Sequence, residues 1–186
     1  MDETYSIDAY VADLKRIAGE SGDEGAIFDQ LGPLAQRLAA EKFWIKPEYA
    51  NTDPEQGFGV HVLHQEDDHT LAIFVVSWAP DKGVPPHDHG TWAVIAGIEG
   101  PERNTTWARV DDRSRDGYAE IEVKKEAVAG PGDLVCIKTG GIHSVWNDTE
   151  NVTLSLHTYG KHVNYTERNQ FDPEANTAEA FKVTVE

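Results

Sequence analysis

The most constraining feature of this chain is a pair of histidines, His87 and His89, followed at once by the apolar run 92–98 (WAVIAGI). The composition and length of this run predict a buried strand. Two histidines one residue apart cannot share a face of a helix, whereas on a strand their side chains point to the same side. We therefore expect both imidazoles to project from the start of a strand toward one point.

A third histidine lies in a second motif. There the short apolar strand 134–137 runs into the turn Gly140-Gly141, and a further strand carries His143. Two imidazoles are rarely enough to hold a first-row metal ion, so His143 completes a candidate metal site with His87 and His89. Taken by themselves, His87 and His89 are more often ordinary surface or loop histidines, and the second motif is what favours metal binding. A site of this kind joins strands far apart in sequence, as a closed barrel or jelly roll does.

The composition limits the possible partners. The chain has 186 residues, of which 39% are hydrophobic and 26% charged, which predicts one soluble domain spanning residues 1–186 with a sizeable core. The net charge of −17 argues against binding to nucleic acid or to an anionic membrane, because both need a basic face. An acidic substrate therefore needs a local positive element, which a metal ion could supply.

The expected location is the cytoplasm. Cys136 is the one cysteine, so no internal disulfide can form, and a reducing compartment fits. Residues 1–4 (MDET) lack the basic and apolar regions of a signal peptide. No apolar run approaches the length of a membrane span. The oligomeric state stays open.

The first 50 residues are predicted to be helical. Residues 6–18 repeat apolar residues at the spacing of one helix face, with Ser6 as the N-cap. A second helix is expected over 23–40, where Gly32-Pro33 should divide or kink it. We expect this pair of helices to cover one opening or flank of the barrel.

Residues 51–186 are predicted to form a β-barrel. Short apolar runs separated by turn residues are typical of a sandwich or barrel. The expected strands are 59–64, 71–78, 92–98, 105–110, 118–123, 134–137, the segment carrying His143, 151–160 and the strand-like end 181–185, with a turn at 100–104. Among the remaining histidines, His61 and His64 are interpreted as structural and His69 as solvated.

A polar trio marks the strand 151–160. Ser155, His157 and Tyr159 alternate along it and so share one face. Three polar side chains are costly to bury unless they hydrogen-bond one another, which predicts a relay with His157 between the two hydroxyls. The alternative is a solvated face on an edge strand, and the nearby three-histidine site favours the relay.

The two histidine motifs resemble those of the cupin superfamily. The second cupin motif, a glycine, five residues, a glycine turn, then His and Asn, corresponds here to Gly132, Gly140, His143 and Asn147. Lys138 stands where many cupins have proline. The glutamate ligand usual in the first motif is absent, since Ala93 and Val94 occupy its place.

The missing glutamate has a chemical consequence. Three neutral imidazoles leave the charge of a divalent ion uncompensated, which favours an anionic bidentate ligand such as a thiolate with a second donor group. Three imidazole ligands do not fix the identity of the metal, since they suit Fe, Ni, Cu, Zn and Co.

Over roughly residues 59–170 the chain resembles the thiol dioxygenases, the cupin family of cysteine dioxygenase and 3-mercaptopropionate dioxygenase. The resemblance rests on His87-x-His89 with Trp92 close behind, on His143, and on Ser155-x-His157-x-Tyr159. It implies that His87, His89 and His143 hold Fe(II). It also implies that Ser155, His157 and Tyr159 form a hydrogen-bonded triad, with the Tyr159 hydroxyl near the substrate and O₂.

Departures from the eukaryotic-type cysteine dioxygenases favour the bacterial 3-mercaptopropionate type. Val94 replaces the cysteine that is crosslinked to tyrosine there, and residues 59–78 contain no arginine to hold the substrate carboxylate. The 3-mercaptopropionate subgroup is similar in using an arginine after the tyrosine, which points to Arg168 as a bidentate carboxylate clamp. Arg103 is the reserve candidate.

The resemblance therefore implies oxidation of a small thiol to a sulfinate with both atoms of O₂. Two alternatives stay open. One is a cupin dioxygenase that cleaves a C–C bond in a diketone with the same three histidines. The other is a non-catalytic metal-binding cupin, which would have no need of the relay.

Overall fold

The computed structural model describes residues 4–185, and the expectations placed on residues 1–3 and 186 lie outside it. Helix α1 (Ile7–Glu20) and helix α2 (Glu24–Ala40) begin at side-chain caps, because the Ser6 and Asp23 side chains accept backbone N–H groups of the first turns. Helix α2 continues through Pro33 without a break, so the prediction that Gly32-Pro33 divides it is wrong. Neither described helix is long and apolar enough to cross a bilayer.

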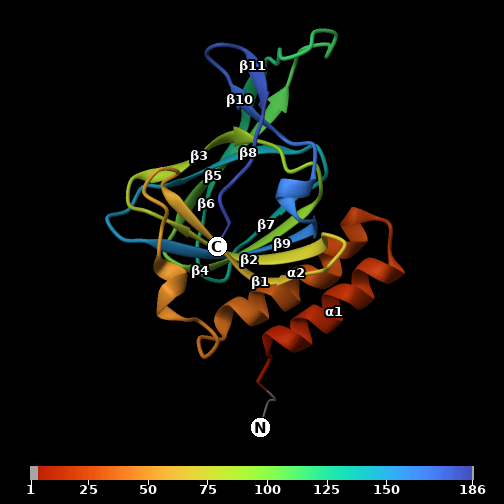
Figure 1. The fold of residues 1–186 in the computed structure, drawn as a ribbon, viewed down its shortest axis with the longest axis vertical. Helices are drawn as coiled ribbons and strands as arrows, with labels where there is room; N and C mark the ends of the chain where they lie inside the picture. Colours follow the sequence, from red (N-terminus) through yellow and green to blue (C-terminus); the bar gives the residue numbers. More distant parts are fainter. Residues whose placement is uncertain (1–3, 186) are drawn as a thin grey trace.

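Eleven strands in the described residues form two antiparallel sheets (Figure 1). The strands are β1 (Phe58–Gln65), β2 (Thr70–Trp78), β3 (Lys82–His87), β4 (Ala93–Glu99), β5 (Glu102–Arg109), β6 (Ile121–Ala129), β7 (Leu134–Ile137), β8 (Ile142–Asn147), β9 (Thr153–Lys161), β10 (Asn169–Asp172) and β11 (Thr177–Ala180). One sheet has the order β1-β2-β9-β4-β7, and the other has the order β11-β10-β3-β8-β5-β6. Short 3₁₀ helices, η1 (Pro47–Ala50) and η2 (Val163–Tyr165), complete the elements.

Strand β2 of the five-stranded sheet is apolar on both faces. On β2, Ile73 and Val75 pack toward the helices, while Phe74 and Val76 face the barrel interior. This alternation explains why residues 71–78 form a continuous apolar run, because a strand covered on both sides needs no polar face. Helix α2 packs against β4, β7 and β9, so the prediction that the helices cover a flank of the barrel is confirmed (Figure 1).

The C-terminal residues differ from their prediction. Residues 181–185 are not a strand; β11 ends at Ala180, and the chain then runs across the barrel (Figure 1). Phe181 and Val183 pack into the interior cluster with Phe74 and Tyr159. The apolar alternation of this segment therefore reflects burial without strand pairing, and Asn164 holds the segment by hydrogen bonds to both the N–H and the C=O of Val183.

Two further boundaries are corrected. The turn predicted at 100–104 ends early, because β5 already begins at Glu102. The exposed edge strand predicted at 118–123 begins at Ile121, and as β6 it does form an edge of the six-stranded sheet.

The histidines of the first hairpin lie outside the candidate site. His61 is buried and hydrogen-bonds the Asn51 carbonyl through Nε2 at 3.0 Å, and His64 pairs with Glu66. Both are structural, as predicted. His69 is half-buried and stacks on Tyr165, so the prediction that it is solvated is wrong.

Candidate metal centre and the cavity around it

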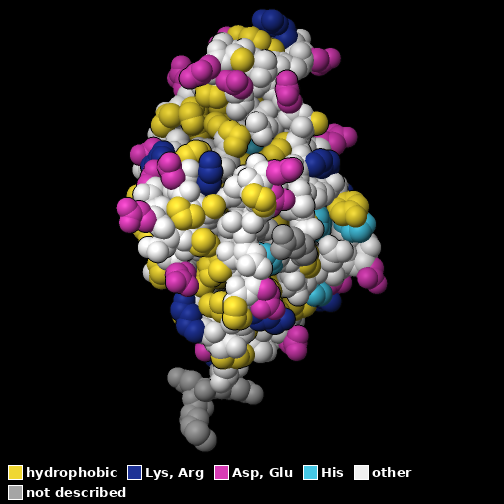
Figure 2. All heavy atoms as spheres, turned by 60° about the vertical axis from the view of Figure 1, so that its left-hand side comes forward, with side chains coloured by type: hydrophobic (Ala, Val, Ile, Leu, Met, Phe, Trp, Pro, Cys, Tyr) yellow, Lys and Arg dark blue, Asp and Glu magenta, His cyan; other side chains and the backbone are white. Residues whose placement is uncertain are grey.

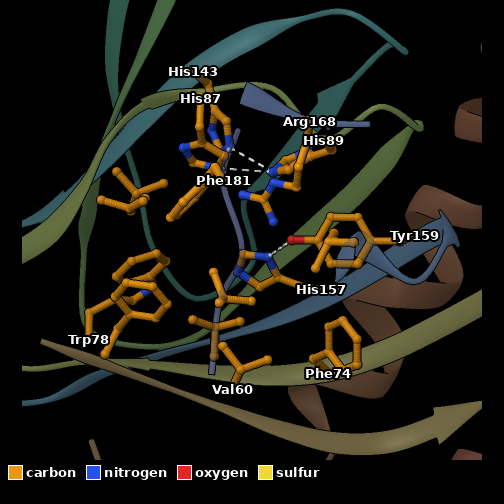
Figure 3. A pocket seen from close by; sticks show the side chains of 16 residues that line it. Val60, Phe74, Trp78, His87, His89, His143, His157, Tyr159, Arg168 and Phe181 are labelled. Atoms are coloured by element: carbon orange, nitrogen blue, oxygen red, sulfur yellow. Dashed lines mark hydrogen bonds between the residues drawn. The ribbon is translucent and has the colours of Figure 1, made fainter. Parts of the chain in front are cut away.

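The candidate site lies in a cavity of about 40 Å³ inside the barrel (Figure 3). On the same measure one water needs on the order of 10–15 Å³, so the cavity suits a ligand of only a few heavy atoms. His87, His89, His143, His157, Tyr159 and Arg168 supply its polar lining, and the rest is apolar: Phe58, Val60, Phe74, Val76, Trp78, Val84, Val145, Val163, Phe181 and Val183.

Two of the imidazoles come from neighbouring strands. His87 is the last residue of β3, and His143 lies directly opposite it on β8. Directly opposed side chains on antiparallel strands lie close together on one face of the sheet. The pairing of β3 with β8 therefore brings together two residues 56 positions apart in sequence.

His89 reaches the same point from a loop. The expectation that both histidines of the pair begin one strand is wrong, since His87 ends β3 and the apolar run forms β4 in the other sheet. The loop is held by the segment after β9: Thr166 Oγ1 donates to the His89 carbonyl at 2.7 Å, and the Asp88 carboxylate accepts from the Asn169 N–H at 2.9 Å. Gly90, with φ of +62°, makes the turn that leaves the loop.

The three Nε2 atoms form a nearly equilateral triangle with sides of 3.1, 3.1 and 3.2 Å (Figure 3). Nitrogens about 2.1 Å from one ion lie about 3.0 Å apart in an octahedral arrangement and about 3.4 Å apart in a tetrahedral one. The observed sides lie between these two values, so the three nitrogens are spaced as ligands of one ion would be. The Nδ1–H of His87 donates to the Pro85 carbonyl at 2.9 Å, which leaves its Nε2 as a lone pair facing the other two rings. One cation satisfies all three nitrogens at once, so these residues fit a metal ion.

All three imidazoles are neutral at neutral pH. Burial lowers the pKa of His143 to about 3, with the Arg168 charge acting in the same direction. Burial and the neighbouring rings also hold the pKa of His87 and His89 well below the ordinary value. Neutral rings offer lone pairs to a metal ion without releasing protons.

These pKa shifts predict an acid-sensitive fold in the metal-free protein. The unfolded chain takes up protons on His143 and His157 as the pH falls below 6.5, but the folded chain resists until about pH 3. Stability is therefore greatest above pH 6.5 and is lost as the pH falls through this window. From pH 7 to pH 5.5 we expect the two rings to lower the free energy of unfolding by roughly 2 kcal/mol, or Tm by roughly 4–8 °C.

Thermal unfolding of the metal-free protein followed by circular dichroism measures this dependence. A His157→Gln variant should show a smaller but still clear slope, since it retains His143, His87 and His89. A Tm that is constant between pH 7 and pH 5.5 would contradict the prediction.

Two residues of the polar trio of β9, His157 and Tyr159, line the cavity beside the three imidazoles, and Ser155 lies behind them. His157 Nδ1 lies 2.8 Å from the Tyr159 hydroxyl (Figure 3), and Ser155 Oγ lies 2.9 Å from His157 Nε2. All three are buried, and the spacing predicted this chain of hydrogen bonds. Burial lowers the pKa of His157 to about 3 and raises that of Tyr159, so the chain carries no net charge at neutral pH. The catalytic role of the trio stays a prediction.

The structure places the two candidate arginines differently. Arg168 is 5% exposed, and its guanidinium points into the cavity (Figure 3). Its Nε donates to the Asp88 carbonyl at 3.2 Å, and its guanidinium lies 4.4 Å from the centre of the Phe181 ring. Burial lowers its pKa to about 10, which leaves it charged at neutral pH. Arg103 instead lies outside the cavity, where it forms ion pairs with Asp148 and Glu126.

Sequence reasoning missed two residues near this site. Phe181, which covers Arg168 and contacts the His87 ring at 5.6 Å, was assigned to a strand. Glu102, assigned to a turn, is a buried carboxyl beside the Ser155 end of the relay. The signal that could have found Glu102 was the alternation of side-chain direction that a strand gives to Glu102, Arg103 and Asn104.

Comparison with known proteins finds only distant likenesses among solved structures. No protein-family model matches the chain, and no curated protein matches it. Solved structures that match include oxalate oxidase bound to the substrate analogue glycolate, at 17% identity over 60% of this chain and 55% of that one, with a TM-score of 0.48. A Klebsiella pneumoniae protein with a double-stranded β-helix domain matches at 13% identity, over 67% of this chain and 92% of that one, with a TM-score of 0.46.

A cupin domain from Schizosaccharomyces pombe matches at 13% identity over 57% of this chain and 66% of that one, with a TM-score of 0.45. The fold of this chain consists of two antiparallel β-sheets with two N-terminal helices. The predicted fold class, mainly β with N-terminal helices, is confirmed. This chain spans about half the length of the oxalate oxidase that it matches, and likeness at this level carries no argument about activity.

Proposed function

We propose that this chain is an Fe(II)-dependent thiol dioxygenase that oxidises a small thiol carboxylate, 3-mercaptopropionate-like or cysteine, to its sulfinate with both atoms of O₂. The observation that carries the proposal is the convergence of three kinds of group on one small cavity. Three neutral imidazoles, the hydroxyl end of a buried relay and a buried guanidinium line it together.

The charges of the cavity favour an anionic substrate. The visible surface carries scattered acidic side chains, in keeping with the net charge of −17 (Figure 2). Inside the cavity the balance is reversed, because Arg168 is positive and the three imidazoles are neutral. When bound, Fe(II) supplies a second positive centre and the electrons needed to activate O₂. A thiolate and a carboxylate on one small molecule match these two positive centres.

The chain's own residues bind and orient the substrate. Arg168 offers a planar set of N–H donors to the substrate carboxylate, and Phe181 holds the guanidinium in place. The Tyr159 hydroxyl, fixed by His157, offers a hydrogen bond to the substrate or O₂. Apolar side chains such as Phe74 and Val145 exclude water, which strengthens these polar interactions.

Replacing Arg168 with glutamine tests the carboxylate clamp. A charged hydrogen bond contributes about 1.5–3 kcal/mol, so we expect KM for 3-mercaptopropionate to rise by roughly 10- to 100-fold. KM for cysteamine, which has no carboxylate, should change far less. The matched control is Arg103→Gln, which removes a half-buried arginine outside the cavity and should leave both KM values as they are. Equal losses with both thiols would show that Arg168 only supports the fold.

Oxygen uptake by anaerobically Fe(II)-loaded protein tests the function itself. The substrates are 3-mercaptopropionate, cysteine, cysteamine and mercaptosuccinate, with mass spectrometry of the products. Uptake with a sulfinate product supports the proposal, and incorporation of both atoms from ¹⁸O₂ identifies the reaction as a dioxygenation. No uptake with any thiol by a fully iron-loaded protein would overturn it. Activity on a diketone, or tight metal binding without uptake, would then identify one of the two alternatives.

A further inference from the structure

A buried carboxyl lies at the inner end of the relay. Glu102 on β5 is 4% exposed, although most carboxyls are solvated. Thr153 Oγ1 donates to its Oε1 at 3.2 Å, and the Ser155 hydroxyl and the Trp78 indole lie beside the carboxyl, where they act as donors that lower its pKa. The carboxyl therefore lies at the Ser155 end of the hydrogen-bonded chain that runs from Ser155 through His157 to Tyr159.

Ser155 has one hydroxyl proton, so the direction of its hydrogen bond with Glu102 decides the direction of the bonds from Ser155 through His157 to Tyr159. Ser155 Oγ accepts from the Trp78 indole N–H at 3.3 Å and can donate only once. If Ser155 donates to Glu102, then His157 Nε2–H must donate to Ser155, and His157 Nδ1 accepts from the Tyr159 hydroxyl. If Glu102 donates to Ser155, every bond reverses, and His157 Nδ1–H donates to the Tyr159 oxygen.

The two directions present different chemistry to the cavity. In the first, the Tyr159 proton is used inside the chain, and the hydroxyl can only accept from a ligand. In the second, the hydroxyl proton is free to be donated into the cavity. The direction depends on whether the Glu102 carboxyl has a proton to give.

We propose that Glu102 is a positioning residue that sets the direction of the relay: protonated, it makes the Tyr159 hydroxyl a donor toward the cavity, and ionised, it makes that hydroxyl an acceptor. The consequence for catalysis rests on the proposed function, whereas the reversal itself is a property of the protein without metal or substrate.

The surroundings of Glu102 favour the protonated form at neutral pH. Its side chain faces Thr153 and Ser155 on β9 and Trp78 on β2, and β6 places Ala129 opposite it. His157, reached through Ser155, is the titratable group of the relay, and Arg103 pairs with Asp148 and Glu126. Burial raises the pKa of Glu102 to about 8, and the three hydrogen bonds only partly oppose this. The reversal is thus expected within an accessible pH range.

The position of the proton on His157 tests the proposal directly. We expect ¹⁵N NMR of histidine-labelled, metal-free protein to show the Nδ1–H tautomer of His157 at pH 6.5 and the Nε2–H tautomer at pH 9.5. A His157→Gln variant assigns the signals. Infrared spectra with ¹³C-labelled glutamate should show a protonated carboxyl that disappears over the same range, and the label separates it from the half-buried Asp88 carboxyl.

A Glu102→Gln variant should abolish the reversal. Its amide N–H can donate to Ser155 at every pH, so His157 should keep the Nδ1–H tautomer throughout. One tautomer in the wild-type protein at both pH values would overturn the proposal, and this measurement does not depend on whether the variant folds.

Turnover separates this proposal from the proposed function. With a pKa of about 8, the protonated fraction of Glu102 falls about tenfold between pH 7 and pH 9, and kcat should fall with it in the wild type but not in Glu102→Gln. Tautomer reversal without any thiol oxidation would overturn the function and support the relay, whereas thiol oxidation with a fixed tautomer would do the opposite.

Discussion

Replacing His143 with alanine is expected to remove bound Fe(II) and to lower thiol oxidation by at least about two orders of magnitude. His143 supplies one corner of the Nε2 triangle, and two imidazoles are fewer than the three protein ligands that catalytic sites of this kind hold. The fold should survive, because β8 pairs with β3 and β5 through its backbone. Metal analysis after anaerobic loading measures the first effect, and oxygen uptake measures the second.

His64→Ala is the matched control. His64 lies on β1 outside the cavity, where it pairs with Glu66. This variant should keep its iron and its activity. If His143→Ala instead bound stoichiometric iron, the ion would have to lie elsewhere, and the three-histidine site would be rejected.

The elements that could be predicted from the sequence are those specified by local pattern. The alternation of Ser155, His157 and Tyr159 placed them on one face of β9, and this needs no knowledge of neighbouring strands. The continuous apolar run at 71–78 also predicted a strand from local pattern alone, and each face of that strand meets apolar partners.

The position of His89 depended on contacts that local pattern does not contain. The prediction assumed one strand through His87 and His89, but β3 ends at His87 and the loop is fixed by Thr166 and Asn169. Those residues lie nearly 80 positions away in sequence. His143 could still be expected near the other two histidines, because a strand that starts at a turn places its first residues at the end of the barrel.

Phe181 and Glu102 were missed because burial was inferred from residue type. An alternating apolar end looks like a strand, although residues 181–185 run across the barrel without pairing, and only their apolar side chains are partly buried against the interior. A glutamate beside Pro101 looks like an exposed turn, although the strand β5 directs its carboxyl inward. In both cases the deciding contacts are made with β9 or with the barrel interior, and sequence periodicity carries no record of them.

The second large effect is expected from Tyr159→Phe. Removing one preorganised hydrogen-bond donor from a buried catalytic site lowers kcat by roughly 100- to 1,000-fold, and the same loss is expected here. KM for 3-mercaptopropionate should change little, because Arg168 still faces the cavity. The variant also leaves His157 Nδ1 without its partner, which should lower the free energy of unfolding by about 1–3 kcal/mol. Tyr165→Phe, at an exposed tyrosine outside the cavity lining, is the control and should retain full activity.

The Tyr159→Phe variant also shows whether the relay acts as one unit. If Glu102 acts only through the orientation of the Tyr159 hydroxyl, the effect of Glu102→Gln on the pH profile of kcat should vanish once that hydroxyl is gone. Residues in one hydrogen-bonded network show such non-additive effects, whereas independent sites add. A double variant whose losses equal the product of the single losses would mean that Glu102 and Tyr159 act separately. A double variant no worse than Tyr159→Phe would place the whole contribution of Glu102 at the cavity end of the chain, at the one proton that faces the substrate.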